Sequence, residues 1–238
     1  CKTCELVQLA HNYDLKYLYG PDYGYRTGIN KTMLNHVKNI TSNLSKKTNL
    51  KKNDLVLDIA SNDGTLLNNY NKNIITFGID PILDKYKKYY KNINYSKNDF
   101  FSKNAVKSKT KKKFKIITAL SVFYDLNNPN KFLKDVHDIL DENGLFLLEF
   151  ADLASLIKLN MFDTICHEHA EYYSTNVLLK MFQNNNLRLI QINKNDINGA
   201  SKQFLLTKKR SKYKSNQKNI NDILREEKLL KLDYPKTY

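Results

Sequence analysis

The fold is decided by the stretch Asp54-Leu-Val-Leu-Asp-Ile-Ala-Ser-Asn-Asp-Gly-Thr-Leu-Leu67. Its apolar run, Leu55 to Ile59, predicts a buried strand, and the small and polar residues after it predict a turn and then a helix. Asp80 closes the next apolar run, about twenty residues further on, where an acid can hold two ribose hydroxyls. The stretch predicts the first half of a doubly wound nucleotide-binding fold, although a strand, turn and helix of any α/β protein would share the pattern.

The turn excludes two phosphate-binding patterns. No Gly-Lys-Ser or Gly-Lys-Thr follows the strand, so the turn is not a P-loop. The dinucleotide pattern G-x-G-x-x-G is also absent, because only Gly64 stands in the turn. A turn with an acid, Asp63, and few glycines suits a nucleoside ligand without a pyrophosphate. S-adenosylmethionine fits this description, because it is a cation with ribose hydroxyls and no phosphate.

Strands and helices alternate along the rest of the chain. Apolar runs at 114–120 and 145–150 predict buried strands, and Pro129 marks the start of a helix between them. Two further runs, 187–192 and 202–207, predict an antiparallel pair of strands. The sequence therefore predicts an α/β fold with a Rossmann-like, mostly parallel sheet, helices on both faces and an antiparallel edge.

The composition limits the partners. The 238 residues include 39 Lys and Arg against 24 Asp and Glu, which gives a net charge of +15. The excess is mostly Lys, and the densest cluster, at 109 and 111–113, is better explained as a solvated loop before a strand than as a nucleic-acid patch. A nucleic-acid partner is therefore the less favoured interpretation. No apolar run reaches the roughly eighteen residues of a membrane span, and three cysteines without a signal-peptide pattern favour the reducing cytoplasm.

The N-terminal residues carry two binding patterns. Cys1-Lys-Thr-Cys4 is half of a tetrahedral zinc site, and His11 is a poor third ligand. Tyrosines then cluster with turn residues and Arg26. A hydroxyl-rich ligand such as a sugar suits this cluster, although a cap packed on the core would also explain it. The clustered tyrosines are Tyr13, Tyr17, Tyr19, Tyr23 and Tyr25.

The most reactive segment is Phe162-Asp-Thr-Ile-Cys-His-Glu-His-Ala-Glu-Tyr-Tyr173. In an extended chain, His167 and His169 lie on one side and Glu168 on the other. One of the histidines could act as a general base oriented by an acid. A metal site and a polar loop remain alternatives, because H-x-H is an incomplete metal motif and differs from the helical H-E-x-x-H pair.

Five motifs in order resemble one family. They are Cys1-x-x-Cys4 with Glu5-Leu-Val-Gln-Leu9, Tyr23-Gly-Tyr-Arg-Thr-Gly28, Leu57-Asp-Ile-Ala-Ser-Asn-Asp-Gly-Thr-Leu66, Asp163-Thr-Ile-Cys-His-Glu-His169-x-Glu-Tyr-Tyr173 and Asn198-Gly-x-Ser201. Over about residues 1 to 207 the chain resembles the S-adenosylmethionine-dependent C-methyltransferases of nucleotide-linked keto-deoxysugars. The C-H-E-H-x-E-Y-Y block with N-G-x-S is the most specific part of the resemblance.

The resemblance implies three segments and a reaction. Residues 1–48 would form an N-terminal segment with a partial zinc motif and a Tyr-rich substrate loop. Residues 49–208 would form the cofactor-binding methyltransferase core, and residues 209–238 would begin a C-terminal region that is cut short here. A base would remove a proton next to a ketone, and the enolate would attack the methyl group of the cofactor.

The resemblance also implies a set of site residues. The catalytic group would be His169, Glu168 and the tyrosines Tyr23 and Tyr25. The cofactor would lie against Asp58, Ala60, Ser61, Asn62, Gly64, Asp80, Asp99 and Leu120. A nucleotide-sugar substrate would meet Arg26, Tyr124, His167, Asn198 and Ser201. Zinc would bind Cys1 and Cys4.

The sequence departs from the family at several positions. Ala60 replaces the first glycine usual in the cofactor turn, and its Cβ adds strain if the position needs a positive φ. Cys166 stands where some relatives have a tyrosine, and Tyr124 stands near where some have a histidine. Because a first zinc cysteine pair and most of the C-terminal domain are absent, we expect a fragment or a shortened member with weak or no turnover alone. A methyltransferase of another small molecule or of RNA, and a non-catalytic fragment that binds S-adenosylmethionine, remain the alternatives to a sugar methyltransferase.

Overall fold

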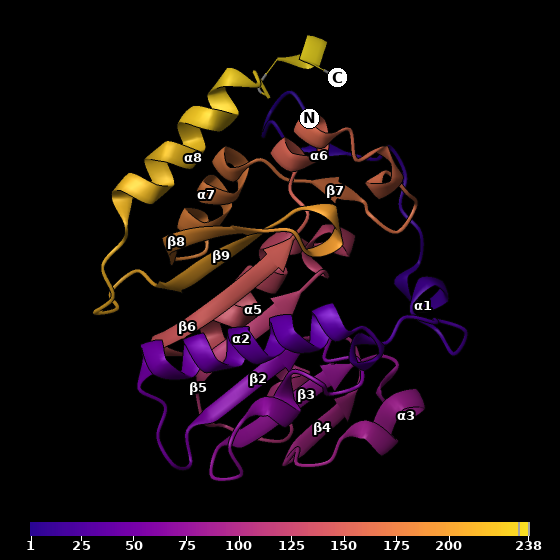
Figure 1. The fold of residues 1–238 in the computed structure, drawn as a ribbon, viewed down its shortest axis with the longest axis vertical. Helices are drawn as coiled ribbons and strands as arrows, with labels where there is room; N and C mark the ends of the chain where they lie inside the picture. The colour runs from indigo at the N-terminus through magenta and orange to yellow at the C-terminus, as the bar shows by residue number, and fades with distance from the viewer. Residues whose placement is uncertain (233, 238) are drawn as a thin grey trace.

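A seven-stranded sheet forms the centre of the computed structural model, which describes residues 1–232 and 234–237. Its strands are β2 (Leu55–Ile59), β3 (Ile75–Asp80), β4 (Tyr95–Asn98), β5 (Phe114–Leu120), β6 (Leu140–Phe150), β8 (Leu187–Asn195) and β9 (Ser201–Lys208). Their order is β4-β3-β2-β5-β6-β9-β8 (Figure 1). The pairs from β4 to β6 are parallel, and β9 runs antiparallel to both β6 and β8. The predicted α/β class with an antiparallel end is confirmed.

Helices cover both faces of this sheet. They are α1 (Leu15–Leu18), α2 (Lys31–Thr48), α3 (Leu83–Tyr86), α4 (Lys103–Lys107), α5 (Pro129–Ile139), α6 (Leu153–Leu159), α7 (Thr175–Asn184) and α8 (Gln217–Leu229). In Figure 1, α2 crosses the front of the sheet, and its apolar side packs on alternate sheet residues such as Val56 and Ile116. Residues of α5, α7 and α8 pack with the other sheet residues, such as Leu57 and Phe146. Because both faces are covered, every residue of β2 is buried.

Local sequence explains where several helices begin. Asn128 and Ser174 accept hydrogen bonds from the first turns of α5 and α7, and Pro129 is the first residue of α5.

The helix expected after the turn at 60–64 does not form, and a single 3-10 turn, Leu67–Asn69, takes its place. Positive φ angles at Ala60, Asn62 and Gly64 leave too little helical backbone before β3 begins. In addition, β6 begins at Leu140, five residues earlier than the apolar run predicts.

A second, two-stranded sheet ties the start of the chain to a distant segment. Antiparallel strands β1 (Val7–Gln8) and β7 (Glu171–Tyr172) pair Val7 with Tyr172. Each strand has only two residues, which is why the sequence pattern does not predict them. The pairing fixes the end of the segment that contains His169, which runs from α6 to β7. Among the described residues, none belongs to a helix that is long and apolar enough to cross a bilayer.

Candidate active site

A cavity of about 590 Å³ lies at the carboxyl ends of β2, β3 and β5. Ala60, Asp80 and Leu120, which stand at or just after the ends of these strands, all line it. Open α/β sheets bind ligands at this edge, where neighbouring crossovers diverge. Segments far apart in the sequence complete the wall. They contribute Tyr19, Tyr23, Tyr25, Tyr124, Asp125, Glu168, His169 and Asn198.

The turn after β2 is held open by backbone geometry. Ala60 has φ 56° and Asn62 has φ 49°, so both adopt the left-handed conformation that favours glycine. Ala60 therefore does carry the strain that its Cβ predicts. Asp80 fixes the turn, because its Oδ2 accepts from the backbone N–H of Asn62 at 2.8 Å and its Oδ1 accepts from Ile82 at 2.8 Å. Burial raises the pKa of Asp80, although these two hydrogen bonds oppose the shift.

Asp58 and Tyr90 also hold the turn in place. Asp58 is buried within β2, and the Thr118 hydroxyl donates to its Oδ1 at 2.6 Å. Burial raises the pKa of Asp58 to about 7. The Tyr90 hydroxyl bonds Ser61 Oγ at 2.8 Å and donates to the Asn62 carbonyl at 3.0 Å. The turn is thus fixed before any ligand enters.

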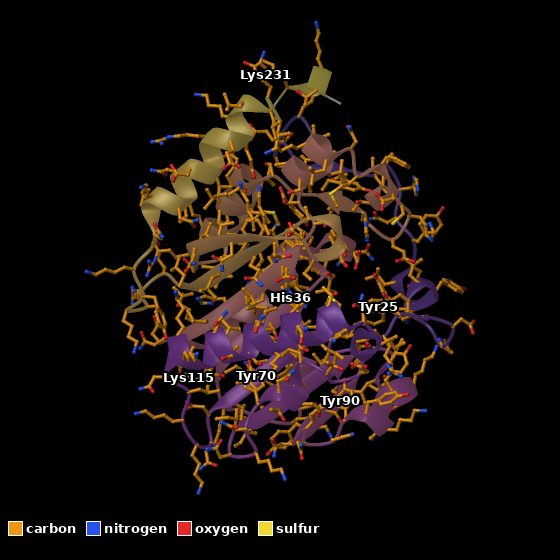
Figure 2. All side chains as sticks on the ribbon, viewed as in Figure 1. Tyr25, His36, Tyr70, Tyr90, Lys115 and Lys231 are labelled. Atoms are coloured by element: carbon orange, nitrogen blue, oxygen red, sulfur yellow. The ribbon has the colours of Figure 1, made fainter. Side chains whose placement is uncertain are left out.

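The Tyr-rich loop crosses directly over this turn. The backbone N–H of Thr27 donates to Asn62 Oδ1 at 2.9 Å, and that of Gly28 donates to Asp63 Oδ2 at 2.9 Å. The Asn62 amide returns a hydrogen bond to the Tyr25 carbonyl at 3.1 Å. Figure 2 labels Tyr25 and, below it, Tyr90, both to the right of the middle of the view. Residues predicted for substrate and cofactor therefore form one wall of the cavity.

His169 lines the cavity from the segment between α6 and β7. Its Nδ1 donates to the Thr164 carbonyl at 2.7 Å, because a carbonyl can only accept. This bond fixes the tautomer and leaves the lone pair on Nε2. Burial is the main cause that lowers the pKa of His169 from 6.5, so the ring stays neutral at pH 7. The Tyr124 ring packs on the imidazole, with 4.1 Å between ring centroids.

The structure places most of the predicted site residues in the cavity wall and some outside it. The Arg26 guanidinium pairs with Asp63 at 3.2 Å and stacks on Tyr89, so it holds the loop instead of facing the cavity. His167 is exposed against Tyr13, and the Ser201 hydroxyl donates to the Ile197 carbonyl. The predicted residues that line the cavity are Tyr23, Tyr25, Asp58, Ala60, Ser61, Asn62, Asp80, Leu120, Tyr124, Glu168, His169 and Asn198. Those outside the lining are Arg26, Gly64, Asp99, His167 and Ser201.

Sequence reasoning missed one pair in the cavity wall. The Tyr19 hydroxyl donates to Asp125 Oδ2 at 2.7 Å, across 106 residues of sequence. Asp125 follows β5 at the carboxyl edge of the sheet. Its position just after a predicted strand could have identified it as a candidate site residue. The pairing partner could not have been found, because nothing local connects Tyr19 to that strand.

The two N-terminal thiols are exposed. Across residues 1–232 and 234–237, no group of three or more His, Cys, Asp and Glu side chains is placed to hold a metal ion. Two thiolates supply half of a tetrahedral zinc site. The described residues therefore do not fit a closed zinc site, and no step of the chemistry below involves zinc.

The strand order and the position of the cavity define a class I methyltransferase fold. A methyltransferase from Clostridium acetobutylicum, described as S-adenosylmethionine-dependent, superposes with a TM-score of 0.58 at 14% identity, over 73% of this chain and 91% of that chain. Magnesium protoporphyrin IX methyltransferase from Synechocystis, solved with bound S-adenosylhomocysteine, gives a TM-score of 0.56 at 13% identity, over 82% and 92%.

Sequence comparison shows the family. The family model described as Methyltransferase domain matches residues 29–192, which is more than half of the chain. The chain belongs to this family. The C-methyltransferase NovU of Streptomyces niveus is 24% identical over 209 residues, which cover 84% of this chain and 48% of NovU. The chain thus spans about half the length of this curated relative.

Proposed function

We propose that the chain binds S-adenosylmethionine and transfers its methyl group to a carbon next to the ketone of a nucleotide-linked keto-deoxysugar. The observation that carries the proposal is the state of His169, whose Nε2 lone pair is free while its Nδ1 is held by Thr164. His169 lines the same cavity as the turn at 60–62. The family match supports methyl transfer, and the resemblance of the His segment and the similarity to a C-methyltransferase support carbon as the acceptor atom.

The backbone geometry of the turn and the acidic groups of the cavity suit the cofactor. Left-handed backbone at Ala60 and Asn62 lets the chain turn tightly beside a ligand, and Asp80 stands at the position that holds ribose hydroxyls in this fold. Asp58 and Asp80 also add acidic groups beside a ligand that is a cation. When bound, S-adenosylmethionine supplies an electrophilic methyl group for the substrate carbanion.

The residues of the chain supply the base and the orientation. The ketone acidifies the neighbouring C–H bond, and His169 Nε2 takes that proton while the electron pair delocalises onto the carbonyl oxygen. The new C–C bond would then form from this carbon to the methyl group, while the bond between that methyl group and the cofactor sulfur breaks and its electron pair stays on sulfur. Thr164 keeps the imidazole in the required tautomer, and burial keeps it neutral by lowering its pKa. The tyrosines Tyr23 and Tyr25 supply hydroxyls and ring faces for the sugar.

Calorimetric titration with S-adenosylhomocysteine tests the cofactor site. Asp80→Asn is preferred to Asp80→Ala, because the amide oxygen can still accept one of the two backbone hydrogen bonds that fix the turn. We expect binding by the unmodified chain, and a loss of about tenfold or more in affinity, about 1.4 kcal/mol, in Asp80→Asn. Asp222→Asn on the exposed side of α8 is the control and should bind normally. A folded chain that binds no S-adenosylhomocysteine would refute the proposal.

Proton exchange tests the base. In deuterium oxide with S-adenosylhomocysteine present, the chain should exchange the proton next to the ketone of a nucleotide-linked 4-keto-6-deoxysugar, followed by NMR. His169→Gln should slow this exchange by about 10²- to 10⁴-fold, whereas His137→Gln, on α5 beside Asp138, should not. Equal exchange in the His169→Gln variant and the unmodified chain would remove His169 as the base.

A further inference from the structure

A buried carboxyl group lies in the cavity wall without an assigned role. Asp125 ends the 3-10 turn Phe123–Asp125 that follows β5, and it is 3% exposed. It lines the same cavity as Tyr124 and His169. A carboxyl so deeply buried needs partners for its oxygens, because desolvation otherwise destabilises the folded chain.

The two oxygens of Asp125 differ in their partners. Oδ2 accepts the hydrogen bond of the Tyr19 hydroxyl at 2.7 Å. Oδ1 is buried and has no hydrogen-bond partner within the part of the chain that the structure describes. The Tyr19 ring also packs against the ring of Tyr23, with 5.1 Å between the ring centroids, and this contact helps to hold Tyr19 in place. The pair therefore leaves one carboxyl oxygen available to a ligand.

The surroundings of Asp125 favour its neutral form. Burial raises the pKa of Asp125 well above its ordinary value, and the nearby carboxylates Glu168 and Glu171 raise it further, although the Tyr19 hydrogen bond opposes the shift. The titratable groups that face Asp125 are Tyr19 and Tyr23 from the loop, Glu168 and His169 from the segment before β7, Glu171 and Tyr173 around β7, and Tyr124 beside it. Since Tyr19 already donates to Oδ2, the proton of the neutral acid belongs on Oδ1.

We propose that Asp125, oriented by Tyr19, donates a hydrogen bond from Oδ1 to the carbonyl oxygen of the substrate. This assignment rests on the proposed function, because it needs a substrate with a ketone. When His169 Nε2 takes the proton from carbon, the C–H electron pair moves toward this oxygen, and the Asp125 hydrogen bond stabilises the negative charge there. The Asp125 proton is shared and not transferred, and the electron pair returns when the new C–C bond forms.

The role of Asp125 narrows the chemical class of substrate that the cavity can take. A donor at Oδ1 selects a group that accepts a hydrogen bond at the oxidised carbon, and it stabilises a developing negative charge only if that group is a carbonyl. A carboxylic acid kept neutral by an apolar site is an established way to provide such a donor. The base and the donor would then act on neighbouring atoms of one substrate, from the segment before β7 and from the end of β5.

Two variants of Asp125 separate a donor from a structural role. Asp125→Asn keeps the shape, an oxygen for Tyr19 and an N–H donor, whereas Asp125→Leu removes the donor. In the deuterium-exchange assay, we expect Asp125→Asn to stay within about tenfold of the unmodified chain and Asp125→Leu to lose about 10²- to 10³-fold. The rate of the unmodified chain should fall with rising pH as Asp125 ionises, and Asp125→Asn should lack that fall. Exchange by Asp125→Leu at the unmodified rate would overturn the proposal.

An infrared measurement tests the assignment without turnover. The difference spectrum between the unmodified chain and Asp125→Asn, both with S-adenosylhomocysteine at pH 7, should contain the C=O band of a protonated carboxyl. A carboxylate band in its place would overturn the role of Asp125 and leave the base untouched. Exchange that depends on His169 but not on Asp125 would likewise overturn that role alone. Failure of the unmodified chain to exchange any keto-sugar tested would instead overturn the proposed function and this assignment with it.

Discussion

Ala60 occupies a conformation that its side chain disfavours. Its φ of 56° lies in the left-handed region, where a Cβ costs about 1–2 kcal/mol. Ala60→Gly removes that strain, and the greater freedom of glycine in the unfolded chain offsets about half of the gain. We therefore expect the free energy of unfolding in urea to rise by about 0.5–1 kcal/mol. The control is Ala105→Gly in α4, which should lower it by a similar amount. A loss of stability in both variants would contradict this reading of the turn.

The neutral state of His169 predicts an acid limb in the pH profile. Burial lowers the pKa of His169 below 6.5, so the competent neutral ring persists at neutral pH and is lost only as the pH falls below 6.5. We expect the deuterium-exchange rate to be level near pH 7 and to decline with an apparent pKa under 6.5. His137→Gln should leave that limb in place. A midpoint above 6.5 would mean that Glu168 outweighs desolvation at this ring.

At the scale of elements, the loop over the cofactor turn depends on one glycine. A Cβ on Gly28 would stand 2.6 Å from both Asp63 Oδ2 and Thr65 Oγ1, and Asp63 cannot move freely because it accepts from Gly28 and pairs with Arg26. Gly28→Ala should lower the free energy of unfolding by about 1–3 kcal/mol. Gly24→Ala is the matched control in the same loop, because a Cβ there meets nothing within 4 Å. Its effect should stay within about 0.5 kcal/mol, and equal losses would show that the loop is not held by Asp63.

A buried ion cluster joins strand β9 to the helices α6, α7 and α8. Lys202 on β9 is 3% exposed and pairs with Asp152 at 2.8 Å and with Glu227 of α8 at 2.6 Å. Asp152 caps the first turn of α6, and Glu227 accepts from the backbone of Thr175 at the start of α7. The cluster therefore fixes the starts of two helices as well as the position of α8.

Removing the cation from this cluster should be costly. Lys202→Met leaves two buried carboxylates without a counter-charge, and we expect a loss of about 3–5 kcal/mol in the free energy of unfolding. Lys194→Met breaks the neighbouring exposed pair with Glu226 and should cost at most about 1 kcal/mol. Urea unfolding of both variants makes the comparison. Similar losses would mean that Lys202 contributes through its packing and not through its charge.

At the scale of the whole molecule, the net charge of +15 acts on stability. Raising salt from about 0.01 to about 0.15 M shortens the screening length from about 30 to about 8 Å and weakens the mutual repulsion of the lysines. Salt also weakens exposed ion pairs such as Lys194–Glu226. The relief of repulsion among the uncompensated positive charges is the larger of these two effects on stability. We expect the free energy of unfolding to rise, on the order of 1 kcal/mol, equally in sodium and potassium chloride. A fall with salt would mean that the exposed ion pairs outweigh the repulsion.

Sequence predicted the sheet better than it predicted the site. Long apolar runs such as 55–59 and 114–120 are buried on both faces, and helix caps such as Ser174 are local signals, so both could be read directly. The Tyr19–Asp125 pair and the Lys202 cluster join positions far apart in sequence, and no local pattern encodes such contacts. The helix expected after the turn failed because left-handed residues, Asn62 among them, continue beyond the strand.

The cluster around Lys202 also orders events in time. Glu227 is synthesised 25 residues after Lys202, which takes about 1–5 s at the usual rate of translation. During that interval Lys202 has Asp152 as its one acidic partner in the cluster, and the backbone N–H of Thr175 lacks the carboxylate that accepts its hydrogen bond in the folded chain. A nascent chain can therefore assemble the parallel strands first, and Lys202 gains its second carboxylate only when the sequence of α8 has emerged from the ribosome.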